Sequence, residues 1–271
     1  MNEALRIGAA LEANLIEQVR YFGKSPMVNF YDETKMVRML TGLPISTLNL
    51  IAGAKLSEVN IDHEIELALA PFKRQNVPLI WWVGPKSLPN NLGSYLEKQG
   101  LEKVFDMLGM YHQLDELEDD LDFPGAFCYK RVDNDFLLRE WAETQTRAFG
   151  GQQSDTEHIY NFEKTLGTEQ NSSWLRYIGY MSKEPVGVSI LFQGAGTAAI
   201  FNVATVPEFR RRGIGTLMTK IPLIEAHSMG YQYSVLKATP MGVHLYRNMK
   251  FKECCQIALF FLPAKELLSN R

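Results

Sequence analysis

Apolar residues recur with two different periods along the second half of the chain, and this pattern predicts alternating helices and strands. Helical spacing predicts helices over residues 134–149, over residues 154–166 and from Ile214 onward. Ser154 and Glu157 have the spacing of a capping box at the start of the second helix. The strand-like runs are AFCYKRV, WLRYIGYM, VGVSILFQ, AAIFNVATV, QYSVLKA and FKECCQIALFFL.

This order of elements predicts an α/β (α+β) protein with a mixed central sheet flanked by helices. WLRYIGYM and VGVSILFQ are joined by SKEP and predict a hairpin, whereas AAIFNVATV is apolar on both faces, as is typical of a central strand. Pro222 lies inside the third predicted helix, so we expect a kink or an early helix end there.

The first half of the chain repeats part of this pattern. STLNLIAGAKLSE is similar to AAIFNVATVPEFR, with Asn49 in the place of Asn202. LGSYLEKQGL parallels GVHLYRNMKF, with Leu96 in the place of Tyr246, and PLIWWVGP indicates a strand before it. The repeated order of strand, helix, strand and short helix indicates a duplicated domain.

Six acidic residues precede a Pro-Gly turn in DELEDDLDFPG, residues 115–125. Such a run is typical of a solvated linker, and the alternative is an acidic surface that attracts a cationic substrate. A linker here divides the chain into two domains of ordinary size, residues 1–120 and residues 121–271.

Composition narrows the class of protein. A content of 46% hydrophobic residues and a net charge of −3 indicate a globular protein without a general cationic surface for nucleic acid or anionic lipid. The apolar runs are too short to cross a membrane, and MNEALRIGAALEANL lacks the pattern of a signal peptide, so we expect a cytoplasmic protein. The three cysteines and the histidines lack metal-ligand spacing, so we expect reduced thiols and no metal.

The stretch VPEFRRRGIGTLMTK, residues 206–220, concentrates positive charge at the start of a predicted helix. Backbone N–H groups at a helix start bind anions, and Gly213 and Gly215 let a large anion approach the backbone. The preceding arginines add charge-assisted donors, although the spacing fits neither a P-loop nor a dinucleotide-binding motif. These residues indicate a phosphate or pyrophosphate site, and a tight turn with solvated arginines is the alternative.

R-x-x-G-x-G at residues 210–215 and LYRNMKF two elements later make residues 126–262 resemble the GCN5-related N-acetyltransferase (GNAT) superfamily. The first half resembles the first domain of a tandem member, which implies two tandem GNAT-like domains with a degenerate N-terminal one. The resemblance implies that the turn holds the pyrophosphate of acetyl-CoA (coenzyme A) and that a strand end pairs with its pantetheine arm. The implied cofactor-binding residues are Val203, Ala204, Thr205, Arg210, Arg211, Arg212, Gly213, Ile214, Gly215, Thr216 and Thr239.

The sequence departs from the family pattern at two of these motif positions. Thr239 stands where many members have an asparagine that contacts coenzyme A, which leaves that contact open. Lys250 stands where the family usually has glycine, and this departure affects the turn more than the chemistry.

Acetyl transfer from a thioester to an amine requires a neutral amine, a stabilised oxyanion and a proton for the departing thiolate. Tyr246 matches the family tyrosine near the thioester sulfur, and an ordinary pKa near ~10 keeps it protonated, so the resemblance implies that it is the general acid. The sequence identifies no general base. Ser234 stands where some relatives have a glutamate, and His244 acting through water is an alternative.

Asp155, Glu157 and His158 lie where acceptor sites often form in relatives, but a helix-capping cluster explains them equally well. We therefore expect an acetyl-CoA-dependent N-acetyltransferase that acts on an unspecified small-molecule or peptide amine. A non-catalytic acyl-CoA-binding sensor or scaffold is the alternative. The N-terminal domain, without R-x-x-G-x-G, is expected to be structural, covering the acceptor cleft or forming a homodimer contact, and no nucleic-acid or membrane partner is expected.

Overall fold

The computed structural model describes residues 2–117, 126–169 and 172–265 and has a mixed α/β architecture, as the hydrophobic pattern predicts. Most of the acidic run lies outside these residues, because its positions 118–125 are not described. The linker therefore stays a prediction. None of the helices in the described part of the chain is both long enough and apolar enough to cross a membrane.

The chain forms two compact units, one of which consists of two segments that are separate in the sequence. Unit 1 comprises Met1–Gly109 and Cys254–Arg271, and unit 2 comprises Met110–Glu253. The boundaries fall inside two long strands, β5 (Glu102–Gln113) and β11 (Lys252–Leu262). The observed division thus differs from the expected single boundary near residue 120, because most of β11 belongs to the same unit as the first half of the chain. The assignment of a degenerate and a catalytic domain is not tested by this division and stays a prediction.

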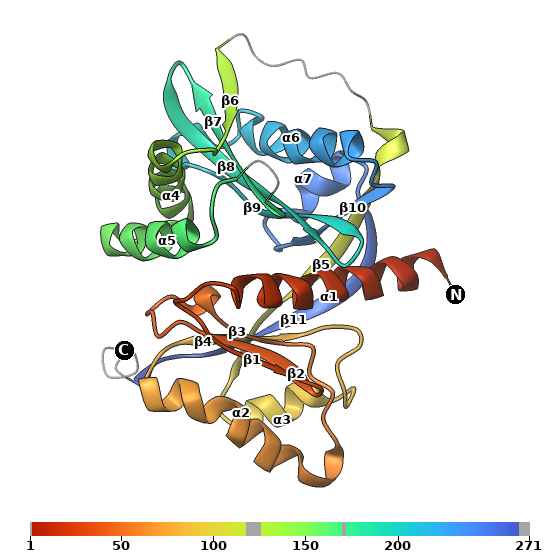
Figure 1. Cartoon of the computed structure of the whole chain (residues 1–271). Helices are drawn as coiled ribbons and strands as arrows, with labels where there is room; N and C mark the ends of the chain where they lie inside the picture. The colour runs from red at the N-terminus through yellow and green to blue at the C-terminus, as the bar shows by residue number, and fades with distance from the viewer. Residues whose placement is uncertain (1, 118–125, 170–171, 266–271) are drawn as a thin grey trace. The chain divides into compact units, whose positions relative to one another are not determined.

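Unit 1 is a sheet with helices on both faces, α1 on one and α2 and α3 on the other (Figure 1). The strand order is β1-β2-β3-β4-β11-β5, in which β3 and β4 are parallel and β11 is antiparallel to β4. Besides β5 and β11, its elements are α1 (Glu3–Phe22), β1 (Asn29–Glu33), β2 (Met36–Leu40), η1 (Ser46–Leu48), β3 (Asn49–Ala52), η2 (Glu58–Asn60), α2 (Ile61–Gln75), β4 (Leu79–Val83) and α3 (Leu92–Lys98).

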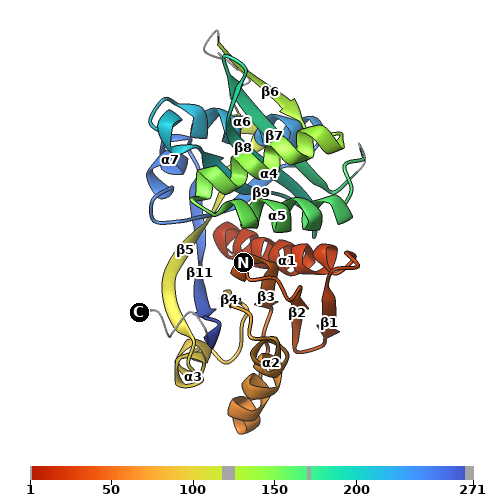
Figure 2. The ribbon, with the colours of Figure 1, turned by 90° about the vertical axis from the view of Figure 1, so that its left-hand side faces the viewer.

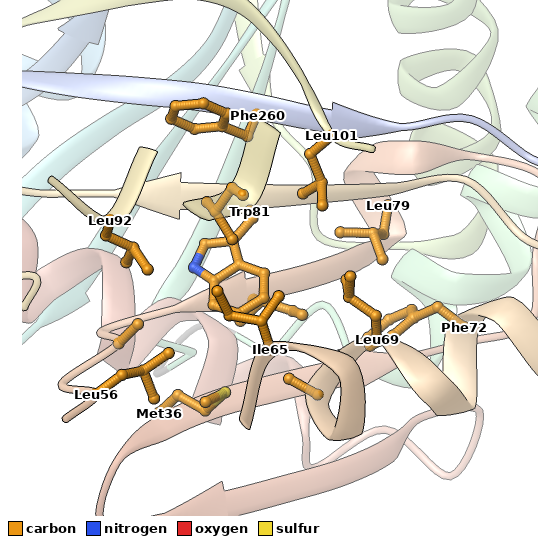
Figure 3. Packing of buried hydrophobic residues seen from close by; sticks show 14 of the residues in the cluster. Met36, Leu56, Ile65, Leu69, Phe72, Leu79, Trp81, Leu92, Leu101 and Phe260 are labelled. Carbon is orange, nitrogen blue, oxygen red and sulfur yellow. The ribbon is translucent and has the colours of Figure 1, made fainter. Parts of the chain in front are cut away.

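The core of unit 1 explains why the last strand is part of it. Trp81 of β4 is fully buried and belongs to one cluster with the apolar face of α2, which includes Ile65 and Phe72 (Figure 3). Phe260 of β11 belongs to the same cluster and is 3% exposed. Burying a large aromatic side chain contributes roughly 1.5–3 kcal/mol, so β11 supplies part of the stability of unit 1.

Unit 2 has the strand order β5-β10-β9-β8-β7-β6, with α4 and α5 side by side on one face of the sheet and α6 on the other (Figures 1 and 2). Its elements after β5 are η3 (Leu114–Glu116), β6 (Phe127–Arg131), α4 (Asp135–Phe149), α5 (Gln153–Thr165), β7 (Trp174–Met181), β8 (Glu184–Gly194), β9 (Thr197–Thr205), η4 (Pro207–Phe209), α6 (Ile214–Ser228), β10 (Tyr233–Ala238) and α7 (Val243–Asn248).

These elements confirm the predicted helices, the β7–β8 hairpin and the central strand, with two corrections at helix ends. The capping box of α5 does not use Ser154 and Glu157, because the helix begins at Gln153 and the N–H of Gln152 donates to Asp155 Oδ2 at 2.8 Å. Of the two outcomes expected at Pro222, the early helix end is wrong, because α6 continues to Ser228, and the kink stays a prediction.

Candidate functional site

Strands β9 and β10 are parallel neighbours that pair over only part of their length. The paired residues run from Ser234↔Ala198 to Leu236↔Ile200, although β9 continues to Thr205 and β10 to Ala238. Beyond Ile200, β9 remains paired with β8 on its other side. The backbone groups that β9 directs toward β10 beyond this point are therefore available to another extended chain.

A β-bulge lies where the two strands part. In the β8–β9 ladder, Val188 pairs with Ala204 and Ile190 with Phe201, so Asn202 and Val203 together oppose one residue of β8. Asn202 adopts the left-handed region at φ 50°, and its side chain donates to Gln145 of α4 at 3.3 Å. The bulge bends the end of β9 and therefore changes the direction in which residues 203–205 point.

The turn after β9 has the geometry of an anion site. Gly213 precedes α6 at φ 79°, a conformation that favours glycine, and no atom lies within 4 Å of the position of an added Cβ. Leu217 N donates to Gly213 O at 3.1 Å, so the N–H groups of Ile214, Gly215 and Thr216 have no acceptor within the helix. The first turn of α6 carries no acidic residue, and the helix dipole adds to these donors.

The three arginines of the turn have different surroundings. Arg210 holds two backbone carbonyls: its Nε donates to Thr205 O at 3.1 Å and its Nη2 to Ala148 O at 2.8 Å. Its guanidinium thereby joins the end of β9 to the last turn of α4. Arg211, at φ 59°, and Arg212, whose guanidinium lies 4.9 Å from the ring centroid of Phe209, are both exposed. Arg210 is thus a structural clamp in this conformation, and the other two guanidinium groups face solvent.

Tyr246 of α7 is buried with its hydroxyl toward α6. It is 8% exposed, its hydroxyl is in hydrogen-bond contact with Thr219, and its ring packs edge-on against Phe251 at 5.6 Å. Burial raises the pKa of Tyr246 to about 12, and the contact with Thr219 opposes that shift. The side chain therefore carries its proton at neutral pH.

The structure gives the candidate bases other roles. Ser234 is fully buried and donates to Ala198 O at 2.8 Å, so it is a structural hydroxyl of the strand pair. His244 is exposed on α7. Asp155 caps α5, and Glu157 pairs with Arg139 at 2.5 Å, which lowers the pKa of the Glu157 carboxyl.

Thr239 and His158 complete the predicted set. Thr239 follows β10, and its carbonyl accepts from Gly242 N at 2.8 Å, which fixes the start of α7. His158 is half-buried, and its buried Nδ1 has no hydrogen-bond partner among the described residues. No group of three or more His, Cys, Asp or Glu in the described ranges could hold a metal ion.

Sequence reasoning missed Lys237, the first residue of β10 after the last paired one. Its Nζ lies 4.9 Å from the ring centroid of Phe201 on β9, and burial lowers the pKa of this lysine to about 7. The signal was present in QYSVLKA, where a lysine interrupts an apolar strand just before its end.

This geometry coincides with a family match. The acetyltransferase (GNAT) family model matches residues 137–251. These residues include the ends of β9 and β10 where the strands part, the turn before α6, and Tyr246. These residues form a GNAT-family domain. The matched residues run from within α4 to Phe251 and lie inside unit 2.

Solved structures extend the likeness beyond the GNAT domain to the whole fold. A GCN5-related N-acetyltransferase from Kribbella flavida is 16% identical over 100% of both chains, with a TM-score of 0.71. One from Sphaerobacter thermophilus is 15% identical over 84% of this chain and 76% of its own, with a TM-score of 0.61. A tandem GNAT protein from the clavulanic acid biosynthesis pathway is 11% identical over 93% of this chain and 87% of its own, with a TM-score of 0.57.

None of the curated proteins compared with this sequence matched it. The tandem GNAT fold is therefore shown by structure, and the GNAT domain by its family model. Members of this family generally transfer acyl groups from acetyl-CoA.

Proposed function

We propose that the GNAT domain transfers the acetyl group of acetyl-CoA to a primary amine of a small molecule or peptide. The observation that carries this proposal is the juxtaposition of three helix-start N–H groups, at Ile214–Thr216, with the parting of β9 and β10. A pyrophosphate needs the first feature, and an extended pantetheine arm needs the second.

The residues present fit this cosubstrate. Gly213 and Gly215 keep the helix start open: an added Cβ at Gly215 would lie 3.3 Å from Leu245 Cδ2 and 3.9 Å from Thr205 Oγ1. The N–H groups of residues 211–216 would donate to the phosphates, with the side chains of Arg211 and Arg212 adding charge at the rim. Arg210 would act indirectly, by holding the end of β9 against α4.

Val203, Ala204 and Thr205 would hold the arm by backbone hydrogen bonds, because β9 lacks β10 as a partner along this stretch. The cosubstrate supplies an acetyl thioester, and the bulge at Asn202 sets the direction in which these residues present it. Thr239, at the mouth of the opening on the β10 side, would line the same arm.

Tyr246 would supply the proton for the departing thiolate. Its pKa of about 12 ensures that the proton is present at neutral pH, and the hydroxyl would exchange its contact with Thr219 for one with sulfur. A sensor or scaffold with the same turn would bind acetyl-CoA without turnover.

The direct test is a calorimetric titration with acetyl-CoA, followed by chromatography of released coenzyme A over a panel of amines. We expect one equivalent bound per chain and amine-dependent release. Two equivalents per chain would contradict the restriction of the site to unit 2. Binding without release for any small amine, amino acid, peptide N-terminus or lysine would favour the sensor.

A further inference from the structure

Lys237 lies at the point where acetyl-CoA is proposed to enter the sheet. It directly follows Leu236, the last β10 residue paired with β9, just as Phe201 directly follows Ile200 on the other strand. The Nζ–ring distance of 4.9 Å places the lysine head over Phe201. The side chain therefore extends toward β9, two residues before the segment that would hold the pantetheine arm.

We propose that Lys237 is a self-acetylation site, whose Nζ takes the acetyl group of acetyl-CoA bound at the α6 turn. This inference rests on the proposed function, because it uses the same bound thioester. It adds an acceptor within the chain, whatever external amine the domain also accepts.

The environment of Lys237 favours a nucleophile over a cation. The ring of Phe201 stabilises an ammonium group, yet Lys237 and Phe201 are half-buried beside the buried rings of Trp174, at 5.8 Å from Phe201, and Phe192, at 6.3 Å, and the loss of solvent around the lysine head prevails. With a pKa of about 7, a large share of the side chain is the neutral amine at neutral pH. An ordinary lysine, with a pKa near ~10.4, is neutral in only about one molecule in a thousand.

The reaction balances without another reactant. The neutral Nζ attacks the thioester carbonyl, a C–N bond forms, and the C–S bond breaks. The amine loses one proton, and the departing thiolate gains one, through Tyr246 or water, so the products are an N-acetyl-lysine and free coenzyme A. Since an amide does not return its acetyl group readily, we expect a single acetyl per chain rather than turnover.

Lys130 provides a matched control. It is an exposed lysine on β6 whose Nζ lies 5.2 Å from the ring centroid of Tyr180, so it has the same kind of cation–π contact without the burial. Because Lys130 lies outside the proposed site, its acetylation measures the chemical background from acetyl-CoA in bulk solution for an exposed lysine.

The experiment incubates the full chain with acetyl-CoA alone and follows acetyl-lysine by peptide mass spectrometry, with released coenzyme A measured in parallel. We expect Lys237 to be modified about tenfold or more faster than Lys130, because the bound thioester is at high effective concentration. Lys237→Arg should abolish the fast release of one equivalent. Gly213→Val, which blocks the proposed phosphate turn, should slow modification of Lys237 about tenfold or more, to its rate with acetyl-CoA from bulk solution.

Two results would overturn the inference while leaving the proposed function intact: calorimetric binding of acetyl-CoA with Lys237 unmodified, or equal modification of Lys237 in the Gly213→Val protein. A calorimetric titration without any binding would instead refute the proposed function, and this inference with it.

Discussion

Units 1 and 2 each contain a comparable pair of parallel strands, β3 and β4 in unit 1 and β9 and β10 in unit 2. Only in unit 2 do the ends of the two strands part without another segment of the described chain pairing there. β3 and β4 pair at Leu50↔Ile80 and Ile51↔Trp81, as β9 and β10 do up to Ile200. In each unit the second residue after the ladder has a positive φ, Gly53 at 69° and Asn202 at 50°. The local backbone is therefore similar, and the difference arises in the segments after the two ladders.

In unit 1 the chain fills its own opening. Leu88 N donates to Ala54 O at 2.9 Å, and Leu56 N donates to Leu88 O at 3.0 Å, so residue 88 pairs in parallel with residues 54–56, which continue the chain from β3. The connection from β4 to α3 has eight residues, 84–91, whereas the one from β10 to α7 has four, 239–242. A longer loop supplies the backbone that closes unit 1.

The helix starts differ as well. Unit 1 passes from η2 directly into α2, whose first turn carries Asp62 and Glu64, whereas Arg210–Gly213 separate η4 from α6. Carboxylates at a helix start repel an anion and already offset the dipole. Two short insertions, one in each unit, thus account for a closed unit and an open one.

The largest expected effect comes from closing the open turn. Gly213→Val should weaken acetyl-CoA binding by at least about 100-fold, the loss expected when about 3 kcal/mol of charge-assisted hydrogen bonding is removed. Calorimetry with acetyl-CoA measures it. Gly230→Val is the matched control: φ there is 82°, and no atom lies within 4 Å of an added Cβ, as at Gly213. Equal losses of affinity in both variants would attribute the effect to backbone strain and refute the phosphate turn.

Removing the hydroxyl of Tyr246 should have the next largest effect. Tyr246→Phe keeps the ring on Phe251 but lowers kcat by ~100-fold, with KM for acetyl-CoA nearly unchanged, because a general acid acts in the chemical step. Initial rates with an accepted amine provide the measurement. An unchanged kcat would remove Tyr246 from the mechanism. Leu96→Tyr, the counterpart in unit 1, should give no activity there.

A substitution of Glu12, on α1, tests whether the loop of residues 84–91 stabilises unit 1. Its carboxylate accepts from Lys86 N at 2.6 Å and contacts Ser87, just before Leu88. Glu12→Ala leaves that N–H without a partner and should lower the free energy of unfolding by about 2–3 kcal/mol in urea denaturation. Glu17→Ala, on an exposed part of the same helix, should change it by less than about 1 kcal/mol. Similar losses would mean that Glu12 does not hold the loop.

The same residue predicts a pH dependence. Burial raises the pKa of Glu12 above its ordinary value of 4.5. Its contribution to stability is therefore full below pH 4.5 and decreases as pH rises through the folded-state pKa. Glu12→Gln does not titrate, so its unfolding free energy relative to wild type should increase over that interval. A pH-independent difference between the two proteins would contradict the shift.

The smallest effect concerns the turn after the short helix of each unit. Lys250 has φ 63° and its counterpart Gly100 has φ 90°. Lys250→Gly relieves a left-handed lysine and should stabilise the protein by about 1 kcal/mol, whereas Gly100→Ala should destabilise it by about as much. Thermal unfolding of both variants measures this, and a loss of stability in Lys250→Gly would show that its side-chain contacts outweigh the strain.

Periodicity predicted the elements of unit 2 because each element buries one continuous face. It could not assign β11 to unit 1, because an apolar strand is equally suited to either sheet and its partner β4 is distant in sequence. It placed the repeat at Asn49 and Asn202, whereas the backbone matches Gly53 to Asn202, since similar letters do not fix register. Arg210 illustrates the same limit: its charge suggested an anion, and its guanidinium binds two carbonyls.

The position of β11 has a consequence for synthesis of the chain. Residues 110–253 of unit 2 are contiguous and can fold as soon as they leave the ribosome, whereas unit 1 waits for residues 254–262. Until then β4, with the sequence LIWWV, keeps an unpaired and strongly apolar edge. The half of the protein that is translated first is therefore completed last, and nascent chains stalled before Cys254 are the ones that would need a chaperone.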